Sequence, residues 1–85
     1  MKALTHNTPV QWFGGTGTLF AEGVFTSVTL ECKPAGDAAA SWVAVGPDTS
    51  FAASPAVANF QLAGGFEIKV TVVGGGAGLG IFLAT

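Results

Sequence analysis

The chain has 85 residues, of which 49% are hydrophobic and only 9% are charged, and its formal net charge is −2. A domain of this size buries only roughly 60% of the surface that its unfolded chain exposes, so such domains usually need disulfides, a metal or oligomerisation. The single cysteine excludes an internal disulfide, and one cysteine with one histidine are too few soft ligands for a structural metal site. Three lysines and no arginine argue against a nucleic-acid partner. Oligomerisation is therefore the expected means of stabilisation.

The first nine residues differ in pattern from the rest of the chain. Residues 1–9 show no hydrophobic period and end in a proline, so we expect an extended N-terminal arm there and a single β-sandwich domain over residues 10–85. Residues 1–10 hold no apolar run typical of a secretory signal. The longest apolar stretch, residues 70–85, is shorter than the roughly twenty residues of a spanning helix, so we expect no membrane span.

Short runs of alternating polar and apolar residues, bounded by Gly, Pro, Asp and Ser, predict strands rather than helices. The expected strands are 10–13, 18–25, 26–33, 41–45, 49–53, 57–62, 66–73 and 79–84. In the clearest of the early ones, Val28, Leu30 and Cys32 are expected to face inward. Seven or eight strands spaced about ten residues apart predict an all-β fold, a small antiparallel β-sandwich or jelly roll, with a barrel as the alternative that spacing does not exclude.

Three local features carry further expectations. Trp42 lies within an expected buried strand and should be a core residue, whereas Trp12, close to the arm, should be the more exposed tryptophan, with core, subunit interface and sugar stacking as its open roles. The sequence Ala-Gly-Gly at 63–65 is a candidate hairpin turn. The strands around residues 31–33 and 67–69 share a Glu-x-Lys pattern, whose opposite charges would face each other if the strands were antiparallel neighbours; two unrelated solvent faces are the simpler interpretation.

Few residues are suited to catalysis. His6 lies in the expected arm, Cys32 is expected to be buried, and Glu22 with Glu31 would form a carboxylate pair only if a cleft joined their strands. The glycine-rich segments 14–17 and 74–76 lack the following Lys-Ser or Lys-Thr and the helix of a phosphate loop, so we interpret them as turns or close backbone approaches. We expect no enzyme activity, no catalytic residue, no cofactor and no metal.

A series of short motifs follows in order along most of the chain, from about residue 12 to residue 85. They are GGTGTL at 14–19, EGVF at 22–25, VTL at 28–30, PAGD at 34–37, Trp-Val at 42–43, NFQLAGG at 59–65 and VTV at 70–72. Taken together, this order resembles small virion proteins of tailed bacteriophages. The resemblance implies a β-sandwich or jelly-roll unit, commonly a homotrimer, on a phage head or fibre, and it carries no catalytic residues. The chain has fewer charged residues than many such surface proteins.

Composition and resemblance together predict a capsid decoration or cement protein, in a virion assembled in the host cytoplasm. Such a subunit would stabilise a phage head as an oligomer packed on the major capsid protein, with residues 1–9 tying it to that protein. The alternative is a tail fibre or spike module that binds host-surface glycans through exposed aromatic side chains. The residues expected at an interface are Leu4, His6, Val10, Trp12, Phe13 and Phe20.

Overall fold

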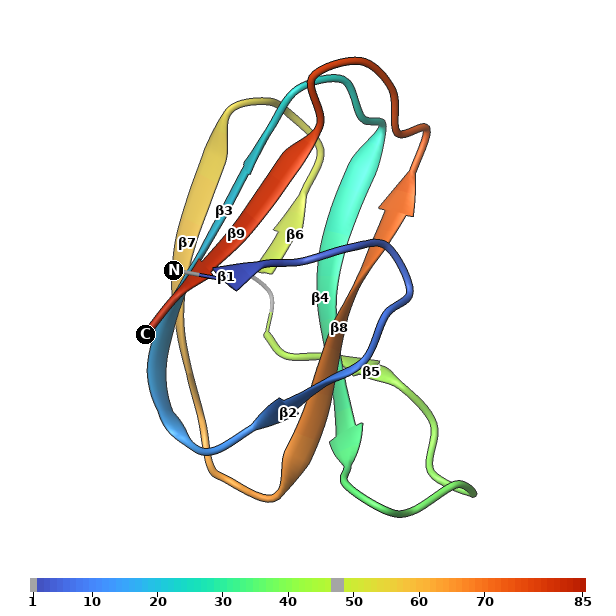
Figure 1. The fold of residues 1–85 in the computed structure, drawn as a ribbon, viewed down its shortest axis with the longest axis vertical. Helices are drawn as coiled ribbons and strands as arrows, with labels where there is room; N and C mark the ends of the chain where they lie inside the picture. The colour runs from blue at the N-terminus through green and yellow to red at the C-terminus, as the bar shows by residue number, and fades with distance from the viewer. Residues whose placement is uncertain (1, 47–48) are drawn as a thin grey trace.

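The structure, a computed structural model, describes residues 2–46 and 49–85. These residues form nine short strands in two packed sheets (Figure 1), and no helix long and apolar enough to cross a membrane occurs among them. The strands are β1 (Lys2–Ala3), β2 (Val10–Trp12), β3 (Gly15–Glu22), β4 (Ser27–Pro34), β5 (Val43–Ala44), β6 (Ser50–Phe51), β7 (Ala56–Leu62), β8 (Phe66–Val73) and β9 (Gly80–Ala84). The predicted all-β class is confirmed.

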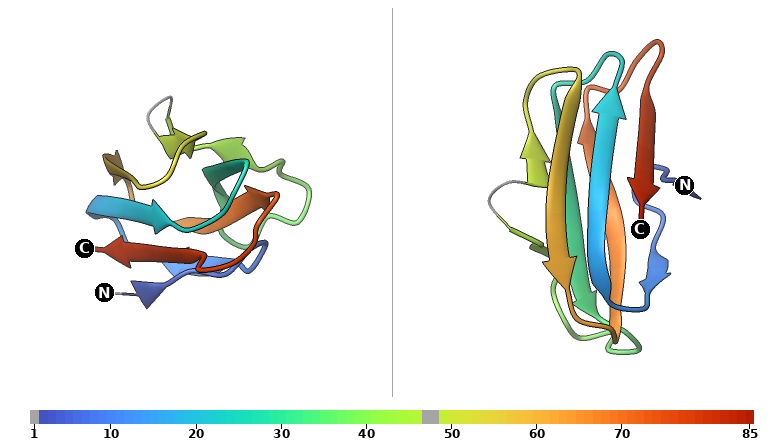
Figure 2. Two further views of the ribbon diagram at one scale, coloured as in Figure 1. Left: turned by 90° about the horizontal axis from the view of Figure 1, so that it is seen from above. Right: turned by 90° about the vertical axis from the view of Figure 1, so that its left-hand side faces the viewer.

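The two sheets stack face to face, as the views in Figure 2 show. Sheet A has the strand order β1-β9-β3-β7, and sheet B has the order β2-β8-β4-β5, with β6 also paired to β4. The antiparallel strand pairs are nested in the sequence, from the two ends of the chain toward its middle. They are β1 with β9, β2 with β8, β3 with β7, and β4 with β5 and β6. This nested pairing, divided between two sheets, is the jelly-roll arrangement of a β-sandwich. It decides between sandwich and barrel, which the sequence left open.

The core lies between the sheets and follows from the alternation of the strands. Each strand with one buried face places every second side chain inward, so apolar residues two positions apart meet those of the opposite sheet. Cys32 is buried on the inward face of β4, as predicted. The most completely buried apolar side chains come from both sheets: Leu19 and Ala21 from sheet A, and Val28, Leu30, Ile68 and Val70 from sheet B.

The predicted hairpin turn at residues 63–65 is wrong. These residues connect β7 in sheet A to β8 in sheet B, so the two strands are not hydrogen-bonded neighbours. Strand β7 pairs with β3, and β8 pairs with β2 and β4. Both strands have an apolar face that needs the same core from opposite sides, and turn residues do not distinguish a hairpin from a connection that passes over the core.

The expected order of exposure of the two tryptophans is reversed, and of the roles left open for Trp12 the structure shows core packing. Trp12 is 4% exposed and belongs to the core. The expected buried strand 41–45 is only the two-residue edge strand β5, in which Val43 is 60% exposed. Trp42 is half-buried just before β5, and its ring lies beneath the ammonium groups of Lys33 and Lys69, 5.2 and 4.6 Å from the ring centroid. Cation–π contacts on the outer face of sheet B therefore hold Trp42 in place of core packing.

Residues 2–9, the described part of the expected arm, lie against the sandwich, and a turn at Asn7 interrupts them, in which the Thr8 N–H donates to the Thr5 oxygen. The first residues of the arm pair with β9 as strand β1, and the Leu4 main-chain N–H donates to the oxygen of Ile81 at 2.8 Å. Leu4 itself is 7% exposed. Beyond it, His6 forms a bridge with Val70 of β8, and β2 continues along the same strand. The segment therefore crosses from sheet A to sheet B and covers the open side between them (Figure 1).

The two Glu-x-Lys segments are antiparallel neighbours in β4 and β8. Glu31 lies opposite Lys69, and Lys33 lies opposite Glu67. The hydrogen bonds of these side chains go to other partners: Lys69 Nζ donates to Asn7 Oδ1 at 2.7 Å, and Glu31 accepts a hydrogen bond from Thr71. The simpler interpretation, two unrelated solvent faces, is therefore wrong: the two strands are neighbours, and their four charged side chains share the outer face of sheet B.

Candidate interaction site

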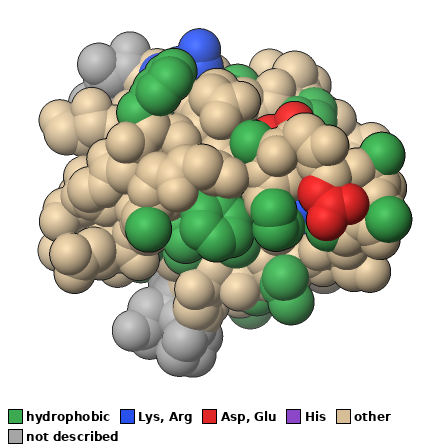
Figure 3. All heavy atoms as spheres, turned by 90° about the horizontal axis from the view of Figure 1, so that it is seen from below, with side chains coloured by type: hydrophobic (Ala, Val, Ile, Leu, Met, Phe, Trp, Pro, Cys, Tyr) green, Lys and Arg blue, Asp and Glu red, His purple; other side chains and the backbone are tan. Residues whose placement is uncertain are grey.

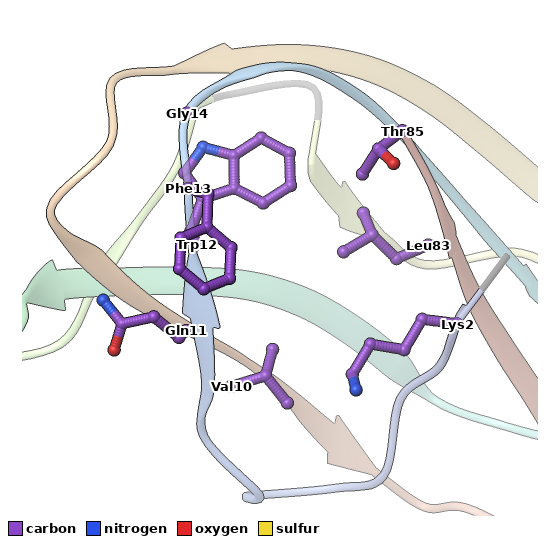
Figure 4. A pocket seen from close by; sticks show the side chains of 8 residues that line it. All are labelled: Lys2, Val10, Gln11, Trp12, Phe13, Gly14, Leu83 and Thr85. Atoms are coloured by element: carbon purple, nitrogen blue, oxygen red, sulfur yellow. The ribbon is translucent and has the colours of Figure 1, made fainter.

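A pocket of about 490 Å³ opens on the side where the two ends of the chain meet (Figure 4). One wall is formed by Lys2 of β1 with Leu83 and Thr85 at the end of β9, and the other by residues 10–14, which are β2 and the tip that follows it. The pocket therefore lies between an edge of sheet A and an edge of sheet B. Its volume is in the range of roughly 300–1,000 Å³ that is common for binding sites.

Trp12 forms a fixed wall of this pocket. Its indole N–H donates to the main-chain oxygen of Leu62 at 2.7 Å, and its ring lies 5.2 Å from that of Phe60 at an angle of 45°. Both partners belong to β7 of sheet A, whereas Trp12 belongs to β2 of sheet B. The ring is therefore held from both sheets, and its polar atom is satisfied as a buried indole requires.

Phe13, the next residue, points the other way and is 88% exposed. Phe13 is the first residue after β2, at the point where the chain leaves sheet B for the turn at Gly14. The backbone at the tip is set by a close approach: Gly14 has a φ of 102°, and a Cβ there would lie 2.9 Å from the amide nitrogen of Gly64. The turn between β2 and β3 and the turn between β7 and β8 therefore pack main chain against main chain, and the Phe13 ring is left exposed to solvent.

The chemistry of the pocket is mainly apolar. Val10, Trp12, Phe13 and Leu83 supply apolar surface, and Lys2 is the ionisable side chain among the lining residues. Figure 3 views the end of the molecule that carries the two packed turns, and hydrophobic side chains gather near its middle. Burial of a phenylalanine side chain is worth about 1.5–3 kcal/mol. The site is therefore suited to hold an apolar or aromatic group of a partner beside the Phe13 ring.

The structure brings together three of the six residues expected at an interface: Val10, Trp12 and Phe13. The other three lie elsewhere. Leu4 is a core residue, and Phe20 is half-buried on the outer face of sheet A, 6.4 Å from the ring of Phe82. His6 is exposed on the arm, where its Nδ1 accepts the main-chain N–H of Val72 at 2.9 Å.

The residues weighed for catalysis do not converge. Glu22 and Glu31 belong to different sheets and lie on their outer faces, so no cleft joins them. Burial in apolar surroundings raises the pKa of the Cys32 thiol, which keeps it protonated and unreactive. Among the residues that the structure describes, no three His, Cys, Asp or Glu side chains lie close enough together to hold a metal ion.

Sequence reasoning missed the contribution of the chain ends to the pocket. Lys2, Leu83 and Thr85 join residues 10–14 only because β1 pairs with β9, a contact between the first and last strands. No pattern within a short stretch of sequence predicts that the first strand pairs with the last one. The Trp-Phe-Gly-Gly sequence did hold a usable signal for Phe13, since two successive aromatic residues in a strand cannot both be buried in the same core.

The fold and this site define a small jelly-roll β-sandwich that presents one aromatic side chain beside an apolar pocket. Comparison of the chain with protein-family models, with curated proteins and with solved structures finds no match.

Proposed function

We propose that this chain is a non-enzymatic structural subunit that works by packing against other proteins, as a decoration or cement subunit on the head of a tailed phage. The observation that carries the proposal is the Phe13 ring, 88% exposed and held at the rim of an apolar pocket. Aromatic side chains are enriched in protein interfaces, and an exposed one next to an apolar pocket is suited to anchor a partner. The major capsid protein is the proposed surface that receives it, and copies of this chain are the proposed neighbours.

The composition supports the same conclusion. Only 9% of the residues are charged, against about 25% in an average soluble domain. Phe13, Val24, Val43, Val57 and Val73 are large apolar side chains that remain exposed in the single chain. In an assembly, neighbouring subunits would cover these apolar side chains, and their burial would stabilise the contacts between subunits. The motif order described above supplies the virion context.

The test is whether the chain binds to virus particles through Phe13. Particles of the source phage are purified on a density gradient, stripped of the chain, and mixed with purified wild-type protein, Phe13→Ala or Val24→Ala. Val24 is a matched control, because it is also an exposed apolar residue but lies beyond the opposite end of β3. We expect wild-type protein and Val24→Ala to sediment with the particles and Phe13→Ala to bind at least about tenfold more weakly. Absence of the chain from purified particles would contradict the proposal.

The second candidate is a tail fibre or spike module that binds host-surface glycans. Trp12 is not available for stacking on a sugar, because its ring is buried. The aromatic side chain that favours this candidate is Phe13, whose neighbours Gln11 and Thr85 supply polar groups at the pocket rim. Glycan binding that is lost in Phe13→Ala, together with location of the chain on tails, would favour this function over the head.

A further inference from the structure

We propose that β7 pairs with β7 of a second copy of this chain, antiparallel and about a two-fold axis at Asn59, so that sheet A continues from one copy into the next. This inference rests on the proposed structural function and names the contact through which copies meet. The strand lies at the outer end of sheet A, where β3 is its one partner in the sheet order (Figure 1).

The first argument is that β7 is a long edge without protection. An exposed strand edge is normally blunted by short length, by Lys or Pro, by a bulge, or by a covering segment. Strand β7 has seven residues, AVANFQL, with no charge and no proline. The other edge strands β1, β2, β5 and β6 have two or three residues each.

The second argument is regularity. Strand β7 pairs with β3 in one unbroken register from Gly15 opposite Leu62 to Ala21 opposite Ala56, so no bulge twists the edge away. Among the residues that the structure describes, one β7 residue has a main-chain hydrogen bond to a group outside sheet A. It is Leu62, whose oxygen accepts from the indole N–H of Trp12. The edge therefore presents a row of main-chain donors and acceptors to a further strand.

The third argument is that the strand is complementary to itself. Antiparallel pairing about Asn59 sets each residue opposite the one equally far on the other side of Asn59. On the inward face, small Ala58 then lies opposite the partner's Phe60, and small Ala56 opposite the partner's Leu62. Alternation of small and large side chains across a strand pair allows close packing. On the outward face, Val57, which is 63% exposed, lies opposite the partner's Gln61.

A second copy is the occupant that this symmetry favours over an unrelated peptide. A two-fold contact uses the same patch on both subunits and closes after two copies, which removes the open edge from both. The homotrimer implied by the phage resemblance would need a different, three-fold contact. If trimers form, a two-fold β7 pair would link a subunit of one trimer to a subunit of the next. The mass of the purified protein distinguishes a dimer from a trimer, since one chain is 8.5 kDa.

The test uses paired charge substitutions whose effect depends on the proposed register. In Val57→Lys/Gln61→Lys, each new lysine faces a lysine of the second copy. In Val57→Lys/Gln61→Glu, each lysine faces a glutamate. On β3, the register neighbours of these positions are the uncharged Phe20 and Thr16, so neither variant creates a new charge pair across β3 and β7. Dissociation constants are measured by sedimentation equilibrium, and circular dichroism with urea unfolding checks that both variants fold.

We expect wild-type protein and the Lys/Glu variant to be dimers, and the Lys/Lys variant to dissociate at least about tenfold more readily than the Lys/Glu variant. A wild-type monomer, or an oligomer that responds equally to both variants, would overturn the inference. Failure here is separable from failure of the proposed function, because particle binding is read through Phe13 and self-association is read through β7.

Discussion

The indole N–H of Trp12 donates to the main-chain oxygen of Leu62 at 2.7 Å and so joins β2 of sheet B to β7 of sheet A. This bond lies beside the pocket that Phe13 borders. It divides two adjacent aromatic residues into different roles: Trp12 holds the sheets together, and Phe13 is left for a partner. The two roles predict that substitution of Trp12 lowers the free energy of unfolding and that substitution of Phe13 leaves it nearly unchanged.

Trp12→Phe should lower the free energy of unfolding by about 1–3 kcal/mol, because it leaves the partly buried Leu62 oxygen without its donor and removes part of the contact with Phe60. Phe13→Ala should change it by no more than about 0.5 kcal/mol, because the ring makes little contact within the chain. Urea unfolding of the three proteins measures both values. Equal losses in the two variants would show that Phe13 also packs within the single chain.

Leu4→Ala tests whether the N-terminal segment is part of the folded domain. Leu4 is buried where the chain crosses from sheet A to sheet B, so its truncation should cost about 2–5 kcal/mol. The neighbouring Thr5 is exposed, and Thr5→Ala is expected to have an effect within about 0.5 kcal/mol. Unfolding curves that show no loss for Leu4→Ala would mean that residues 2–9 do not pack as described.

Strand alternation was sufficient to predict the class and most of the core. Val28, Leu30 and Ile68 are buried as their spacing indicates, because a strand with one face on the core must alternate. The same alternation does not show which sheet a strand belongs to or which strands it pairs with. Trp12 lies in β2 and Trp42 just before β5, and both strands are edges of sheet B. The difference lies in what each ring meets: Trp12 packs on Phe60 of sheet A, whereas Trp42 lies under two lysines on the outer face of sheet B.

The candidate site was predictable in part for a related physical reason. Val10, Trp12 and Phe13 are close in sequence, so a local pattern identified them together. Lys2 and Leu83 are brought to the same pocket by a pairing that spans almost the whole chain. The open edge of β7 was also beyond reach, since it follows from the strand order and not from the sequence of β7.

Two neighbouring glycines separate the effect of backbone conformation from the effect of crowding. Gly14 and Gly15 have φ values of 102° and 105°, where a side chain is strained. A Cβ at Gly15 meets nothing within 4 Å, whereas a Cβ at Gly14 would lie 2.9 Å from the Gly64 nitrogen. Gly15→Ala should therefore cost about 1–3 kcal/mol from conformation alone, and Gly14→Ala should cost more. Urea unfolding of both variants gives the comparison, and an equal or smaller loss in Gly14→Ala would contradict the close packing of the two turns.

Cys32 predicts how stability depends on alkaline pH. Desolvation by burial raises the pKa of its thiol above the ordinary value of 9.0. Below that value the thiol is protonated in both folded and unfolded chains, and its contribution to stability is fully present. As pH rises through the unfolded pKa, the unfolded chain releases the proton first, so stability falls until pH passes the folded pKa. Urea unfolding between about pH 7 and about pH 10.5 should therefore show a steeper loss for wild-type protein than for Cys32→Ala, in which the thiol is absent and any cavity gives a constant offset. Parallel curves for the two proteins would show that the thiol is not desolvated in the folded chain.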